Sequence, residues 1–79
     1  MNETQVCELV QSVLDAVAPG ADIRGLGPDQ DLRRALDLDS IDTLNFVVEI
    51  DTRTGRQTNE SDYPKLTKLS GCVQYIAAA

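Results

Sequence analysis

Residues 36–54 have the sequence LDLDSIDTLNFVVEIDTRT, which predicts a helix with a serine at its start. Asp39 is a good N-cap residue, and Asp42 places negative charge in the first turn, where the helix dipole favours it. Thr54 and Gly55 end the helix, because glycine readily adopts the left-handed conformation found after a last turn. We therefore predict a helix over residues 40–54 that begins at Ser40.

The apolar side chains of this helix are too numerous for one face. At about 100° per residue, one group points to one side and a second group points to the opposite side or between them. The first group is Phe46, Val47 and Ile50, and the second is Ile41, Leu44 and Val48. A chain of 79 residues cannot wrap a helix completely, so we expect the second group to be partly exposed. The alternative is that all of these side chains belong to the core.

The flanking segments also have helical periodicity. A helix over residues 3–18 is predicted by an apolar stripe, by a capping box of Asn2 and Gln5, and by Pro19-Gly20 at its end. Residues 19–39 form a long connection that leucines hold in place, with a short helical turn over residues 29–36. A short helix over residues 61–66 and a last helix over residues 67–78, capped by Thr67, complete the chain. The predicted fold is all-α: one domain over residues 1–79, a small antiparallel bundle of three longer helices and one short helix.

The composition excludes several classes of function. The chain has no histidine, which removes the commonest general base and the commonest zinc ligand, so we expect neither a catalytic site nor a metal site. The net charge of −6 argues against nucleic acid as a partner, because phosphate contacts need lysine and arginine clusters. Two cysteines, no export signal and no apolar run of membrane-spanning length indicate a cytoplasmic protein.

The acidic charge is concentrated in one stretch. Residues 37–62 hold seven acidic and two basic residues. Such a surface either keeps the protein soluble or attracts basic partners, and we favour the second interpretation.

Ser40 is the candidate for chemistry. The N-terminus of a helix has unpaired N–H groups and a positive dipole end, which suit an anion attached to the serine oxygen. The neighbouring acids Asp39 and Asp42 repel phosphate, but they are suited to face a basic partner enzyme or a divalent cation. The simpler alternative is that Ser40 only caps the helix.

The run Leu36-Asp37-Leu38-Asp39-Ser40-Ile41 resembles the attachment motif of acyl carrier proteins, which is usually Leu-Gly-x-Asp-Ser-Leu. The order of the predicted helices, the long leucine-containing loop and the chain length are similar to that family from end to end. The resemblance implies that a phosphopantetheinyl transferase attaches 4'-phosphopantetheine to Ser40, beside Asp39. The arm then carries acyl groups as thioesters.

The resemblance also implies roles along the helix that follows. A docking surface for acyl-loading and acyl-processing enzymes with basic surfaces would comprise Ile41, Asp42, Leu44, Val48, Glu49 and Asp51. Phe46, Val47 and Ile50 would line the core that shelters acyl chains.

Several residues depart from the family pattern. Asp37 occupies a position where glycine is common, Ala35 and Asn45 replace frequent acids, and Thr54 and Thr58 replace a core aromatic and an aliphatic residue. Polar core residues favour a small acyl cavity, so we predict a specialised lipid or secondary-metabolite carrier instead of the carrier of general fatty acid biosynthesis.

Two other functions remain open. A peptidyl or aminoacyl carrier would have the same fold and the same serine, although such carriers are usually less acidic. A helical interaction module without a prosthetic group would use the apolar stripe to bind a partner helix. A calcium sensor is excluded by spacing, because a loop that starts at Asp37 has Ile41 at its fifth position and Val48 at its twelfth.

Overall fold

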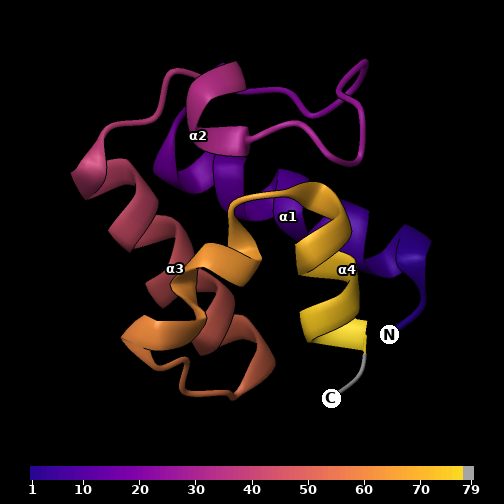
Figure 1. Cartoon of the computed structure of the whole chain (residues 1–79), viewed down its shortest axis with the longest axis vertical. Coiled ribbons are helices and arrows are strands. Elements are labelled where there is room, and N and C mark those ends of the chain that lie inside the picture. The colour runs from indigo at the N-terminus through magenta and orange to yellow at the C-terminus, as the bar shows by residue number, and fades with distance from the viewer. Residues whose placement is uncertain (78–79) are drawn as a thin grey trace.

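The computed structural model describes residues 1–77, which form helices in the order α1, α2, α3, η1 and α4 (Figure 1). Their bounds are Glu3–Val17, Leu32–Ala35, Ser40–Thr54, Glu60–Leu66 and Leu69–Ala77, and η1 is a 3₁₀ helix. Helix α1 packs against both α3 and α4, and η1 packs against α4. Across residues 1–77 the only β-type pairing is one isolated bridge, so the predicted all-α fold is confirmed.

Helix α1 begins where its sequence predicts. The Asn2 side chain accepts a hydrogen bond from the Gln5 N–H at 2.8 Å, and the Gln5 side chain accepts one from the Asn2 N–H at 3.0 Å. This reciprocal pair satisfies two N–H groups that a helix start would otherwise leave unpaired. Its apolar stripe is fully buried at Val6, Val10 and Val13, so the predicted capping box and core face are both confirmed.

Polar contacts as well as leucines order the long connection. Leu32 and Leu38 are buried and Leu26 and Leu36 are partly buried, as predicted. The Gln11 side-chain amide also donates to the Ala21 carbonyl and accepts from the Ile23 N–H, both at 2.9 Å. One glutamine on α1 therefore binds the loop backbone at two positions, residues 21 and 23.

The predicted turn over residues 29–36 is shorter in the structure. Helix α2 starts only at Leu32, because the Asp31 side chain accepts hydrogen bonds from the N–H groups of Arg33 and Arg34. This cap fixes the helix start at Leu32. The preceding residues instead contact the start of α4, where the Ser70 N–H donates to the Pro28 carbonyl at 2.9 Å.

The predicted start of the last helix at Thr67 is wrong. The Thr67 hydroxyl donates to the Pro64 carbonyl at 2.7 Å, which closes η1 and does not cap α4. The Thr67 carbonyl accepts the Leu32 N–H at 2.7 Å and Lys68 pairs with Asp31, so residues 67 and 68 contact the start of α2 before α4 begins at Leu69. The predicted end of this helix at residue 78 lies outside the described residues.

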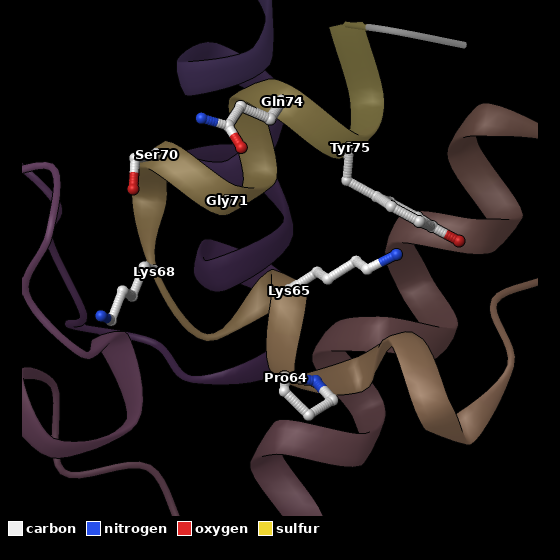
Figure 2. A pocket seen from close by; sticks show the side chains of 7 residues that line it. All are labelled: Pro64, Lys65, Lys68, Ser70, Gly71, Gln74 and Tyr75. Carbon is white, nitrogen blue, oxygen red and sulfur yellow. The ribbon is translucent and has the colours of Figure 1, made fainter.

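Helix α4 approaches η1 closely at Gly71, as Figure 2 shows. A Cβ atom built on Gly71 would lie 1.9 Å from the backbone oxygen of Lys65 and 3.0 Å from its carbonyl carbon. Only glycine permits this approach without a shift of the backbone. The absence of a Cβ atom at position 71 is therefore what allows α4 to pack on η1, although glycine lowers the helix propensity of α4.

Candidate functional site

Ser40 is the first residue of α3 and is exposed to solvent. Asp39 precedes it in an extended conformation, and its side chain accepts the Asp42 N–H at 2.7 Å. The Asp39 carbonyl accepts hydrogen bonds from the Thr43 N–H at 3.0 Å and from the Thr43 hydroxyl at 2.8 Å. These contacts satisfy the inner part of the helix start and leave the Ser40 hydroxyl at its open end, as the sequence predicts.

The backbone turns sharply just before Ser40. Asp37 has a φ angle of +55°, in the left-handed region that glycine adopts most readily. Aspartate is among the few other residues that tolerate this region, because its short polar side chain interacts with the local backbone. This geometry explains how Asp37 can occupy a position where glycine is frequent. The next residue, Leu38, is buried and donates its N–H to the Arg33 carbonyl at 2.8 Å.

Arg33 reaches the serine itself. One terminal nitrogen of its guanidinium group donates to Ser40 Oγ at 3.1 Å. Sequence reasoning did not identify this residue, since seven positions separate it from Ser40 and the contact depends on the turn at Asp37. A phosphodiester on Ser40 Oγ fits this arrangement, because the oxygen is exposed, lies at a helix N-terminus and has a cation beside it.

The predicted apolar stripe lies on the open face of α3. Ile41 is 68% exposed, Leu44 is 48% exposed and Val48 is 51% exposed, whereas Phe46, Val47 and Ile50 are buried. The division into two apolar faces is therefore confirmed, and the alternative that all of these side chains form the core is wrong. A stripe of exposed apolar residues beside acidic ones has the composition of a surface for transient partners.

A family model described as a phosphopantetheine attachment site matches residues 4–76. The chain belongs to the family of carrier proteins with a phosphopantetheine attachment site. Acyl carrier protein 2 of Ralstonia nicotianae is 28% identical over 85 residues, in an alignment that covers 100% of each chain. No solved structure gives a significant match. Phosphopantetheine is accordingly the group that this carrier holds, and the match supports a non-catalytic role at the level of the family.

The acidic residues of the predicted docking surface differ in their surroundings. Asp42 is half-buried, and its backbone N–H donates to the side chain of the N-cap residue Asp39. Glu49 forms an ion pair with Arg53 at 3.1 Å along α3, and Arg53 also donates to the Ser12 hydroxyl on α1. Part of the charge of Glu49 is therefore compensated within the carrier.

Asp51 is bound within the carrier. One carboxylate oxygen accepts the Thr58 hydroxyl at 2.6 Å, and the other accepts the Thr58 N–H at 2.8 Å. The Tyr75 hydroxyl of α4 lies 3.4 Å from the Thr58 hydroxyl, and the Arg56 guanidinium lies over the Tyr75 ring at 4.2 Å. Asp51 thus fastens the loop after α3, and its contribution to docking stays a prediction.

The proposed acyl-sheltering residues are closely packed. Phe46, Val47 and Ile50 form one core cluster with side chains of α1, and each contributes about 1.5–3 kcal/mol by burial. Five surface hollows of the described residues are lined by other side chains than these three. Their role toward an acyl chain stays a prediction, and a chain entering between them has to separate the helices.

A hollow of about 520 Å³ lies elsewhere, between η1 and α4 (Figure 2). Lys65 and Lys68 border it, and the Lys65 ammonium forms an ion pair with Asp62 at 2.9 Å. The pKa of Lys65 is raised, mainly by its hydrogen bond with Asp62. The hollow contains neither Ser40 nor the α3 stripe among its lining residues, so it is separate from the site described above.

The thiols of the carrier are unequal. Cys72 is completely buried, and burial raises its pKa to about 12, while Cys7 is half-buried. The Cys72 thiol contacts the Leu66 carbonyl at 3.4 Å.

Over residues 1–77 no cluster of three or more histidine, cysteine, aspartate or glutamate side chains is arranged to hold a metal ion. The same residues contain no helix long and apolar enough to cross a bilayer.

Proposed function

We propose that Ser40 is the attachment residue for phosphopantetheine and that the protein carries acyl groups as thioesters on that arm. The observation that carries the proposal is the position of Ser40: exposed, first in α3, and inside the region matched by the attachment-site family. In the loading reaction Ser40 Oγ attacks the phosphorus of coenzyme A that bears the pantetheine. A new P–O bond forms at Oγ, the P–O bond to the adenosine-bearing phosphate breaks, and the serine proton passes to a base of the transferase.

The proposed partners are a phosphopantetheinyl transferase and acyl-loading and acyl-processing enzymes with basic docking surfaces. The docking surface that we propose is Ile41, Asp42, Leu44, Val48, Glu49 and Asp51. Its small apolar stripe and acidic rim favour encounters that form quickly and also dissociate quickly, as a carrier needs when it visits several enzymes. The arm supplies the thiol and raises the effective concentration of the acyl group at each enzyme, so the carrier itself needs no general base. The proposal places these encounters in the cytoplasm.

We further propose that the cargo is a short or polar acyl group of a specialised lipid or secondary-metabolite pathway. The Thr54 hydroxyl donates to the Ile50 carbonyl at 2.8 Å, and the Thr58 hydroxyl is bound to Asp51. Both threonines therefore bring hydrogen-bonded oxygen atoms to the lower end of the core. Displacing Thr58 from Asp51 to admit a long alkyl chain would leave polar atoms without partners, which costs about 1–3 kcal/mol for each buried atom.

The test is the intact mass of the protein after incubation with a broad-specificity phosphopantetheinyl transferase, coenzyme A and Mg²⁺. The wild type and the control variant Ser61→Ala, which changes an exposed serine of η1, are each expected to gain one phosphopantetheine. Ser40→Ala is expected to gain none. Loading of Ser40→Ala, or no loading of folded wild type, would remove Ser40 as the attachment residue. After loading, competition between short-chain and long-chain acyl groups for the wild-type carrier tests the proposed cargo.

A further inference from the structure

We propose that Arg33 binds the phosphodiester that joins the arm to Ser40 and so holds the first atoms of the arm against α2. This inference rests on Ser40 as the attachment residue. It assigns a phosphate-binding role to a residue of α2, whereas Ser40 and the proposed docking surface lie on α3.

The backbone of Arg33 is fixed relative to Ser40. Asp31 caps the first turn of α2 and accepts the Arg33 N–H at 2.9 Å, while the Arg33 carbonyl accepts the Leu38 N–H at 2.8 Å. Leu32 and Leu38 are both buried, which anchors the two ends of this short segment in the core. The backbone from which the Arg33 side chain extends is therefore fixed, and the guanidinium group lies 3.1 Å from Ser40 Oγ.

The charge of Arg33 has no carboxylate partner in the described structure. Among residues 1–77 the ion pairs within 4.0 Å are formed by Arg24, Arg53 and Lys65, and none involves Arg33. Within residues 1–77 its side chain donates a hydrogen bond to the uncharged hydroxyl of Ser40. A guanidinium group has five N–H donors and pairs with phosphate through two parallel hydrogen bonds. Loading places an anion on the oxygen that Arg33 already contacts, and so supplies the partner that this cation lacks.

The surroundings give Arg33 a specific use. Asp37, Asp39 and Asp42 lie close to Ser40 in the chain and repel a phosphate group. Arg33 offsets this repulsion at the one atom where the phosphate is attached. The N–H groups of Ser40 and Ile41 also have no acceptor among residues 1–77, because Asp39 receives those of Asp42 and Thr43. The start of α3 therefore offers two unpaired backbone donors in addition to the guanidinium group that contacts the attachment oxygen.

There is room for the phosphate beside Arg33. A hollow of about 370 Å³ is lined by Asp31, Arg33, Arg34 and Leu38, on the α2 side of the serine. Asp31 contributes a negative charge to this hollow, but one of its oxygens is occupied by the N–H groups of Arg33 and Arg34. Arg24 is exposed, pairs with Asp22 and is not among the residues that line this hollow, so Arg24→Gln is a control for the loss of one positive charge.

The experiment is ³¹P NMR of the loaded carrier, with the urea-unfolded loaded carrier as the reference for a phosphodiester free of protein contacts. We compare wild type, Arg33→Gln, Arg33→Lys and Arg24→Gln, each checked for fold by circular dichroism and for loading by intact mass. The ³¹P resonance of wild type and of Arg24→Gln is expected to be displaced from the reference. Arg33→Gln is expected to lose most of that displacement, and Arg33→Lys to keep part of it, because the charge remains without the planar fork.

A second measurement uses the wild type alone and does not depend on the folding of a variant. The Nε–H resonance of Arg33 is expected to shift on conversion from the unloaded to the loaded form, while that of Arg24 stays in place. Equal ³¹P displacement in Arg33→Gln and wild type, or an unchanged Arg33 resonance on loading, would overturn the phosphate-binding role and leave Ser40 as the attachment residue. Failure of folded wild type to load would instead remove both.

Discussion

Replacement of Gly71 by alanine tests the close approach of α4 to η1. Helix propensity alone predicts a gain in the free energy of unfolding of up to about 1 kcal/mol, because alanine is the better helix former. The structure predicts the opposite sign. The new Cβ atom would lie 1.9 Å from the Lys65 backbone oxygen, and relief of that overlap requires α4 and η1 to separate.

The size of the effect follows from that separation. A carbon–oxygen contact is comfortable at about 3.3 Å, so the two helices must move apart by about 1.4 Å. Lys65 presents backbone, which cannot rotate away as a flexible side chain would. Overpacking of this kind costs about 1–3 kcal/mol or more, and we expect a net loss of about 2 kcal/mol after the gain in propensity. For a domain of this length the melting temperature falls by about 10 °C.

The assay is urea unfolding followed by circular dichroism, with Gly27→Ala as the control. A Cβ atom on Gly27 meets only the Gln30 side chain, at 3.7 Å or more, and its φ angle is not in the left-handed region, so we expect a change within about 0.5 kcal/mol. Unchanged or increased stability of Gly71→Ala would refute the packing of α4 on η1 described above.

Three further predictions concern other parts of the carrier. Thr58→Val removes the hydroxyl that binds Asp51 and lowers the free energy of unfolding by about 1–2 kcal/mol in urea titrations; the exposed Thr52→Val, which also loses one hydroxyl, is expected to cost less, and equal losses would argue against the buried network. Iodoacetamide at pH 8.5 is expected to alkylate Cys7 well before Cys72, because burial raises the Cys72 pKa to about 12 and keeps its thiol protonated. Equal alkylation of both thiols in the folded state would contradict the burial of Cys72. The pKa of this thiol is 9.0 when unfolded, so Cys72 leaves the free energy of unfolding unchanged below pH 9 and lowers it as the pH rises toward 12. Ile41→Ser is expected to leave the free energy of unfolding within about 0.5 kcal/mol of wild type and to raise the KM of the transferase several-fold; an unchanged KM would exclude Ile41 from the docking surface.

The sequence predicted those features that depend on neighbouring residues. The Asn2–Gln5 capping box, the start of α3 after Asp39 and the end of α3 before Gly55 all involve groups within a few positions of one another. The exposure of Ile41 followed from helical periodicity together with the small size of the chain. Local hydrogen bonding and the helical repeat are properties of the sequence itself, so these elements and the position of the candidate serine were accessible without coordinates.

Only the tertiary structure decided how distant residues meet. The hydroxyl of Thr67 could cap a helix equally well by sequence, but its carbonyl pairs with Leu32 and delays α4 to Leu69. By sequence alone Gly71 only weakens a helix, whereas the structure shows that the Lys65 carbonyl packs where a Cβ atom would lie. Arg33 reaches Ser40 because the chain turns at Asp37, which has a positive φ angle. Such contacts depend on the angles and distances at which the helices pack, and these arise from the joint burial of many side chains instead of from any one local pattern.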